Sequence, residues 1–218
     1  MKNILITGGT GNLGGTVVKT LSGNGYHLHL AVRKPIGESL ENVSYYQTNV
    51  SDVEQAGEFV QKILSENVAI NAGVFLAGGF EPRNLEETSM DDISRMIDIN
   101  FTTAFNVAQK LIAHYKTVGG GKLIFVGAKA AMSPQTAIGS SAYSLSKQLL
   151  YHFSELINEG GKSAAVTSHI LLPGIIDTPT NRKVMPDADF SKWVNPNDIA
   201  RTIEDIIAGR ETKNVIEF

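Results

Sequence analysis

The stretch NILITGGTGNLGGTVVKTLSGNG, residues 3–25, predicts the kind of fold that the chain adopts. It begins with a short apolar run rich in β-branched residues, continues into a glycine-rich loop, and ends as a helical pattern that stops in glycines. Gly8, Gly11 and Gly14 have the spacing at which glycines allow a tight turn, let the backbone approach a pyrophosphate and bring a helix close to a strand. Strand, loop and helix in this order favour a dinucleotide-binding loop over an ordinary turn. The loop residues that we expect to bind the cofactor are Gly8, Thr10, Gly11, Asn12, Leu13 and Gly14.

The same alternation of strand and helix runs through the rest of the chain. Further strands are expected at 26–34, 43–50, 68–76, 122–127, 164–174 and 214–218, and helices at 51–67, 89–117, from about 141 and at 195–209. Residues 179–193 are mostly polar and suit either a substrate lid or a surface loop. This order predicts an α/β fold of the Rossmann type, a doubly wound parallel sheet of about seven strands with helices on both faces, in three layers. We expect residues 1–218 to form a single NAD(P)-binding domain.

The composition bounds the partners of the protein. The chain has 218 residues, 42% of them hydrophobic, a formal net charge of -3 and a pI near 6.0, so it offers no basic field to nucleic acid or anionic lipid. It has no cysteine, and its five histidines show no metal-ligand clustering, which argues against a metal site and thiolate catalysis. The N-terminus enters a strand pattern at once and no apolar run approaches ~20 residues, so we expect a cytoplasmic protein without a membrane segment. A small-molecule substrate is the partner that this composition favours.

Residues at the ends of the expected strands indicate which cofactor binds. The second strand ends in Arg33 and Lys34, where a site that prefers NAD(H) usually offers a carboxylate to the ribose hydroxyls. Two cations there suit the 2′-phosphate of NADP(H), so NADP(H) is preferred and NAD(H) remains possible; the alternative is a solvated strand end. Asn49 and Val50 could edge the adenine pocket or be ordinary loop residues. Ala77, Gly78 and Gly79 follow a buried strand and leave room for a ribose.

Two helices carry the candidate catalytic groups. Tyr143 and Lys147 lie one helical turn apart, which places a phenol and an ammonium on one helix face. A close cation stabilises the phenolate and makes proton exchange with a substrate oxygen or nitrogen feasible. Asn100 falls within an apolar helical stripe, where a polar amide needs either a hydrogen-bond partner in the core or a catalytic role.

Taken together, these motifs resemble the short-chain dehydrogenase/reductase family over essentially the whole chain. TGGTGNLG (7–14) resembles its cofactor loop, with Asn12 in place of a glycine of the commonest version. Asn100 matches the helix asparagine of the family, YSLSK (143–147) its Tyr-x-x-x-Lys, and PGIIDT (173–178) its Pro-Gly-x-x-x-Thr.

The resemblance implies roles for these residues. Lys147 would hold the nicotinamide ribose and lower the pKa of Tyr143, and Asn100 would position a water that relays protons to Lys147. Pro173, Gly174 and Thr178 would contact the nicotinamide. A homodimer or homotetramer formed through the two long helices is also implied.

Within the family, VGAKAA (126–131), AGGF (77–80) and DTPTNRKVMPDADFSKW (177–193) resemble the dihydropteridine reductase branch, mainly in the C-terminal half of the chain. That branch has an acid suited to NADH where this chain has Arg33. The usual serine of the family aligns with Gly127 and Ala128, which have no hydroxyl. A quinonoid imine is more easily reduced than a ketone, so the loss of one hydrogen bond to a developing oxyanion is better tolerated there.

The expected function is therefore that of an NAD(P)H-dependent oxidoreductase. Hydride would pass to a C=O or C=N substrate, a quinonoid pterin among the candidates, with Tyr143 as proton donor. The alternative is an NADP(H)-sensing regulatory module with little or no catalysis, which the missing serine favours and the intact Asn100, Tyr143 and Lys147 oppose. An epimerase acting on nucleotide sugars is disfavoured, because the segment after Pro179 is too short for a substrate domain.

Overall fold

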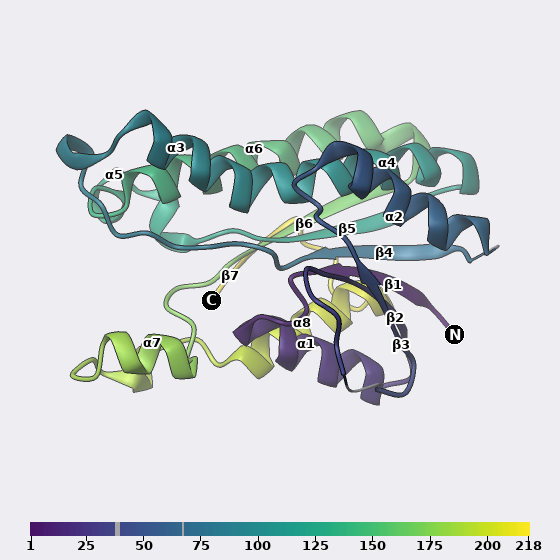
Figure 1. Ribbon diagram of the computed structural model, residues 1–218, viewed down its shortest axis with the longest axis horizontal. Helices are drawn as coiled ribbons and strands as arrows, with labels where there is room; N and C mark the ends of the chain where they lie inside the picture. The colour runs from purple at the N-terminus through teal and green to yellow at the C-terminus, as the bar shows by residue number, and fades with distance from the viewer. Residues whose placement is uncertain (38–39, 67) are drawn as a thin grey trace.

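The strands form the sheet that the sequence predicts. A computed structural model describes residues 1–37, 40–66 and 68–218, and in these ranges the chain forms a seven-stranded sheet with the order β3-β2-β1-β4-β5-β6-β7. Every neighbouring pair is parallel. The order runs outward from β1 in both directions, so the doubly wound topology is confirmed (Figure 1). The strands are β1 Asn3–Thr7, β2 His27–Val32, β3 Val43–Gln47, β4 Ile70–Phe75, β5 Gly121–Val126, β6 Val166–Leu172 and β7 Val215–Glu217.

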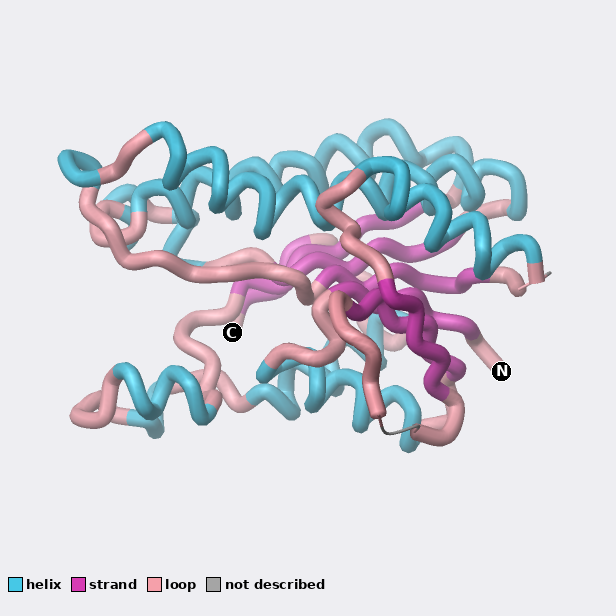
Figure 2. Tube along the Cα trace, in the orientation of Figure 1, coloured by secondary structure: helices cyan, strands magenta, loops and turns pink. Residues whose placement is uncertain are grey.

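Helices cover both faces of the sheet, which confirms the three layers. Figures 1 and 2 show α2, α4 and α6 on one face and α1 and α8 on the other. The strand residues Ile4, Leu5 and Ile6 are fully buried because the two helix layers enclose β1 from both sides. The helices are α1 Asn12–Gly23, α2 Val53–Ser65, α3 Met90–Ile97, α4 Thr103–Val118, α5 Pro134–Ala137, α6 Ser141–Gly161, α7 Pro179–Val184 and α8 Pro196–Ala208, with short 3₁₀ turns at Leu85–Glu87, Lys129–Met132, Lys162–Ala164 and Phe190–Lys192.

The helix expected at 89–117 is not continuous. Ser89 caps α3, as predicted, and shares a capping box with Asp92. The chain then passes through a π-helical turn, Asp98–Thr102, before α4 begins. This turn is invisible to hydrophobic periodicity, because the apolar spacing on either side of it is helical.

Other boundaries also differ from the prediction. Five expected strands are shorter at their ends. The largest difference at a single end, 43–50 against Val43–Gln47, leaves Asn49 and Val50 in a loop. The helix expected at 51–67 is α2, and residue 67 lies outside the described residues. The polar segment 179–193 contains α7, which starts at Pro179 directly after the capping residue Thr178.

Candidate active site

The motif residues meet at one edge of the sheet. In the strand register, Thr7 lies beside Ala31 on one side and Phe75 on the other, and Val126 lies beside Leu171. These residues are at or next to the carboxyl ends of their strands, so the loops that follow the strands leave from the same rim. In a doubly wound sheet this rim is where ligands bind.

The glycine loop is shaped by close backbone packing. Gly8 has φ +71°, and a Cβ there would lie 2.3 Å from the Ala77 nitrogen. A Cβ on Gly14 would lie 2.1 Å from the Gly8 carbonyl oxygen, so the start of α1 can approach β1 only without a side chain. Gly11 precedes α1, and no side chain in the described ranges caps this helix or places an acid in its first turn. The first N–H groups of α1 are therefore available to an anion. Thr10, Gly11 and Asn12 are exposed, Leu13 is partly buried and Gly14 is buried.

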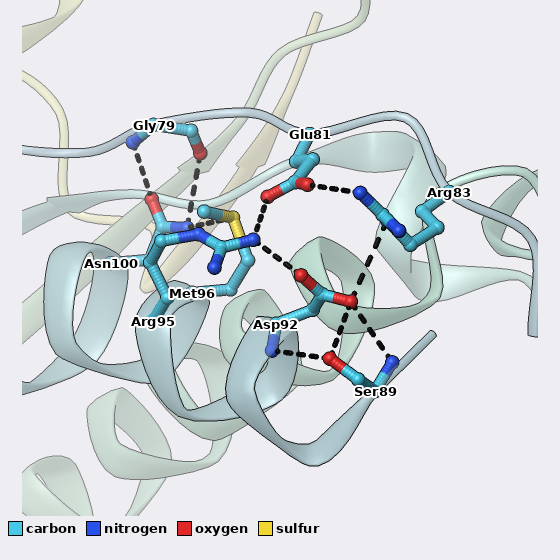
Figure 3. A network of polar contacts seen from close by, with 8 residues as sticks. All are labelled: Gly79, Glu81, Arg83, Ser89, Asp92, Arg95, Met96 and Asn100. Atoms are coloured by element: carbon cyan, nitrogen blue, oxygen red, sulfur yellow. Dashed lines mark hydrogen bonds and ion pairs between the residues drawn. The ribbon is translucent and has the colours of Figure 1, made fainter. Parts of the chain in front are cut away.

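Asn100 lies in the π-helical turn and joins three parts of the site. Its side chain is buried, with 1% of its surface exposed. Its Oδ1 accepts a hydrogen bond from the Gly79 nitrogen at 3.0 Å, and its Nδ2 donates to the Gly79 oxygen at 3.0 Å and to the Ser146 Oγ at 3.1 Å (Figure 3 shows the Gly79 pair). Ser146 in turn donates to the Tyr143 carbonyl oxygen at 2.7 Å. The amide thus connects the loop after β4 to the helix that carries Tyr143.

Lys147 is a buried cation at the end of β5. Its Nζ donates to the Val126 carbonyl oxygen at 2.8 Å, and no carboxylate in the described residues pairs with it. Burial lowers the pKa of Lys147 to about 8, because the charged form loses its hydration. The neighbouring Gly78 is also tightly packed, since a Cβ there would lie 2.7 Å from the Asn100 Oδ1.

Tyr143 is one turn before Lys147 on α6 and is partly buried. The Lys147 Nζ lies 5.8 Å from the centroid of its ring. Burial raises the pKa of Tyr143 to about 12, because the phenolate loses its hydration. The net direction is thus opposite to the lowering that the sequence suggests, and any stabilisation of the phenolate by Lys147 acts against this burial.

Gly127 and Ala128 align with the usual serine of the family, and at Gly127 the surrounding side chains leave little room for a Cβ. A Cβ on Gly127 would lie 2.7 Å from the Leu172 Cδ2, and Ala128 is buried. The Tyr143 ring is contacted by Phe80. The two ring centroids are 5.0 Å apart with an interplanar angle of 78°, and Phe80 is 63% exposed. An exposed aromatic side chain therefore packs against the ring that carries the phenol.

The expected phosphate cations lie at the end of β2. Arg33 and Lys34 are exposed and form no ion pair with any described residue. Arg33 and Lys34 follow Ala31 by two and three residues, and Ala31 lies beside Thr7, the last residue before the glycine loop. The backbone of the two cations is therefore next to that loop. Asn49 is exposed and its Oδ1 accepts from the Ser51 hydroxyl at 2.7 Å, whereas the Val50 side chain belongs to the hydrophobic core.

The segment after β6 closes the rim beside the glycine loop. Pro173 and Thr178 are buried, Gly174 is partly buried, and the Thr178 Oγ1 accepts a hydrogen bond from the Asn181 nitrogen at 3.2 Å. The Asn12 Nδ2 donates to the Thr180 Oγ1 at 2.9 Å, which links the glycine loop directly to α7.

The sequence did not identify Ser146 or Thr180 as parts of this site. The available signal for Ser146 was its place three residues after Tyr143, next to Lys147 on the buried side of the helix. In the described ranges, no group of three or more His, Cys, Asp or Glu residues could hold a metal ion. None of the described helices has the length and apolar character needed to cross a membrane.

The chain is similar in sequence to several oxidoreductases. A family model described as short chain dehydrogenase matches residues 2–189. A dihydropteridine reductase from Dictyostelium discoideum is 31% identical over 208 residues, which cover 93% of this chain and 86% of that protein. The likeness to that branch is thus not confined mainly to the C-terminal half. A 2,3-dihydro-2,3-dihydroxybenzoate dehydrogenase from Escherichia coli is 27% identical over 173 residues, covering 71% of this chain and 69% of that protein.

Solved structures share the fold. ElxO with NADP bound superposes with a TM-score of 0.88 at 24% sequence identity, covering 99% of this chain and 96% of that one. A 3-ketoacyl-(acyl-carrier-protein) reductase from Brucella melitensis, complexed with NADH, has a TM-score of 0.86 at 18% identity, with coverage of 99% and 96%.

Proposed function

The chain belongs to the short-chain dehydrogenase family, and from this premise we propose that it is a reductase that prefers NADPH and reduces a C=N or C=O bond, with a quinonoid dihydropterin as the leading substrate. The observation that carries the proposal is the pair on α6: a phenol, Tyr143, one turn from Lys147, a buried cation without a carboxylate partner in the described residues. The likeness to the Dictyostelium dihydropteridine reductase supports the choice of substrate.

The residues at the rim fit a dinucleotide. The uncapped start of α1 and the side-chain-free Gly8 and Gly14 suit a pyrophosphate, because backbone N–H groups and a helix dipole both favour an anion. Arg33 and Lys34 suit the 2′-phosphate, with NADH as the weaker ligand. When bound, NADPH supplies a hydride. Lys147 would bind the nicotinamide ribose, and Pro173, Gly174 and Thr178 the nicotinamide itself.

Tyr143 would supply the proton. Since burial holds its pKa well above neutrality, the phenol is protonated at pH 7 and has a proton to give to the substrate nitrogen or oxygen. Hydride to carbon and a proton to nitrogen or oxygen complete a two-electron reduction. Lys147, with a pKa of about 8, is mostly charged at pH 7 and stabilises the phenolate that remains. Asn100 donates to the Ser146 hydroxyl, which donates to the Tyr143 carbonyl oxygen, and this chain of contacts would help to fix the position of the phenol.

The lack of a hydroxyl at Gly127 and Ala128 supports a substrate that is easily reduced. A simple ketone develops an oxyanion that the usual serine stabilises, and the loss of one such donor costs about 10²- to 10³-fold in rate. An imine whose reduction restores a conjugated ring depends less on that donor. The same lack supports a second candidate, an NADP(H)-sensing module with little catalysis.

The test is the oxidation of NADPH with quinonoid dihydropterins and a panel of ketones, for the wild type and for Tyr143→Phe. We expect Tyr143→Phe to lower kcat about 10²- to 10⁴-fold while the Kd for NADPH, measured by fluorescence titration, changes less than about twofold. Tyr151→Phe, two turns further along α6, is the matched control and should keep full activity. Unchanged turnover in Tyr143→Phe would contradict the mechanism, and NADPH binding without oxidation by any substrate would favour the sensing module.

A further inference from the structure

Residues 79–83, here called the strap, cross the proposed site between α3 and the start of α6. At one end, Gly79 is held through its nitrogen and its oxygen by the Asn100 side chain. At the other end, the Ser141 nitrogen donates to the Arg83 oxygen at 3.0 Å, and Arg83 forms an isolated parallel bridge with Ser140. The strap is therefore fixed by its backbone at both ends, close to the helix that carries Tyr143.

Alternate residues of the strap are held from one side. Glu81 accepts from the Arg95 Nη2 at 2.6 Å, and the Arg83 Nε lies 3.5 Å from the Asp92 Oδ2 (Figure 3). Together with Gly79, these are the odd-numbered positions, and all of them contact α3 or the π-helical turn that follows it. Phe80 lies between two of these positions, and its ring meets Tyr143 on α6 edge-on.

Arg95 is the residue that connects the middle of the strap to α3. Its Nη2 contacts both Glu81 and Asp92. Asp92 is itself fixed at the start of α3, since its Oδ2 accepts from the Ser89 nitrogen at 2.9 Å and from the Ser89 hydroxyl at 2.7 Å. Ion pairing and these hydrogen bonds hold the pKa of Asp92 far below its usual range, and the pKa of Glu81 is also lowered, so both carboxylates are charged at neutral pH.

This network differs from an ordinary surface ion pair. Arg201 and Asp198 on α8 also pair at a spacing of i,i+3, but that pair joins two neighbours on one helix. Arg95 has the same intrahelical partner at i,i+3, Asp92, and in addition reaches a carboxylate 14 residues earlier in the chain. Its ion pair with Glu81 therefore restrains a loop that makes part of the site.

We propose that Arg95 is a positioning residue of the site: through Glu81 it holds the strap so that Phe80 stays against Tyr143. This inference rests on the proposed reductase function. Phe80 is 63% exposed, so its packing against the protein core is too small to hold the ring in place, and its two neighbours, Gly79 and Glu81, carry the restraint. Loss of Arg95 removes the direct contact of Glu81 with α3 and leaves this carboxylate only its pair with Arg83 at 3.2 Å, inside the strap. The middle of the strap, with its aromatic side chain, therefore becomes more mobile, while Gly79 and Arg83 stay attached. The glycine loop, which has no contact with Arg95, keeps its affinity for the cofactor.

The experiment compares Arg95→Met with the matched control Arg201→Met. Methionine replaces the unbranched aliphatic part of arginine and removes the guanidinium. For Arg95→Met we expect kcat to fall about tenfold, the KM for NADPH to stay within about twofold, and amide hydrogen exchange in 79–84 to accelerate about tenfold or more. Arg201→Met should leave all three unchanged. Arg95→Lys should recover part of kcat, because an ammonium can reach one carboxylate but lacks the planar fork. Glu81→Gln removes the ion pair with Arg95 from the other side, together with the ion pair with Arg83, and should lower kcat at least as much as Arg95→Met.

A double-mutant cycle with Phe80→Leu tests whether Arg95 acts through Phe80. In the Phe80→Leu background, Arg95→Met should lower kcat less than about twofold further. Additive losses, or unchanged kcat and unchanged exchange in both Arg95→Met and Glu81→Gln, would overturn the proposal. Hydrogen exchange needs no turnover, so a wild type that reduces no substrate would refute the proposed function, while unchanged exchange would separately refute the role of Arg95.

Discussion

The two ends of the proposed cofactor site are built in opposite ways. At the catalytic end, Asn100 and Lys147 are buried and their polar atoms are held by backbone groups from distant parts of the chain. At the phosphate end, Arg33 and Lys34 are exposed and pair with no described residue. If the proposed function is correct, the fold sets the geometry of the reaction, and the choice of cofactor depends on exposed side chains that the fold does not need for its stability. Changes at the first end should affect stability and catalysis together, and changes at the second should affect binding alone.

The largest effect is expected from Asn100→Ala. It leaves the Gly79 backbone and the Ser146 hydroxyl without the amide that joins them, so we expect the free energy of unfolding to fall by about 2–4 kcal/mol and kcat/KM about 100-fold. Urea denaturation and steady-state kinetics measure the two quantities.

The matched control for that change is Asn158→Ala, at the opposite end of the sheet. Asn158 makes the same kind of paired contact, with the Ser168 nitrogen at 2.7 Å and the Ser168 oxygen at 2.9 Å. It should lose about 1–2 kcal/mol of stability and keep its activity within about twofold. If both variants lose activity equally, the catalytic end has no special dependence on Asn100.

An intermediate effect is expected from Arg33→Asp. The change should weaken NADPH binding about 10- to 100-fold, because a charge-assisted contact to the 2′-phosphate is replaced by repulsion, and NADH binding should change less than about threefold. Isothermal titration with both cofactors measures the difference, with the exposed Lys116→Asp on α4 as a control for net charge. Equal weakening of NADPH and NADH binding would show that Arg33 is an ordinary surface residue. A large fall in the free energy of unfolding of Arg33→Asp would contradict the view that the phosphate end affects binding alone.

The smallest effect near neutral pH is expected from the titration of Lys147, about twofold at pH 8. The pKa of Lys147 is about 8 instead of 10.5, so kcat/KM should fall as Lys147 loses its charge, by about tenfold per pH unit well above pH 8. Stability should move in the other direction. Between pH 8 and 10 the unfolded chain binds more protons at this residue than the native chain does, so the free energy of unfolding contributed by Lys147 rises with pH.

Rate and stability measured over this pH range would show whether the two trends oppose each other. Arg33→Asp should have the same pH profile as the wild type, since the phosphate end takes no part in this titration. A profile without a loss of rate between pH 8 and 10 would contradict a role for the charge of Lys147.

The sequence was sufficient to predict the sheet, the glycine loop and the helical pair, because each depends on residues close together in the chain. Gly8 and Gly14 are six residues apart and contact each other directly, and Tyr143 and Lys147 share one helix. Short-range spacing of this kind is preserved in the fold.

What the sequence could not predict depends on contacts between distant segments. Asn100 was ambiguous between a core residue and a catalytic one, and its partners lie 21 and 46 residues away. No motif or spacing singles out Arg95, because its partner Glu81 lies 14 residues earlier, before α3. The pKa of Tyr143 was expected in the wrong direction, since spacing gives the distance to Lys147 but not the loss of water around the phenol.

The π-helical turn at Asp98–Thr102 has a consequence for the length of the chain at this point. A π turn accommodates one residue more than an α turn, and an α-helix rotates by about 100° for each residue. Deletion of one residue between 98 and 102 would turn this segment into a regular α-helix and rotate α4 relative to α3. Either Val107 and Leu111 would then lose their buried positions against the sheet, or Asp92 would lose its contact with Arg83 of the strap. Asn100 lies inside this turn, so we expect the deletion also to move its amide away from Gly79. In this chain the asparagine motif is therefore defined by a local insertion as much as by the amide side chain.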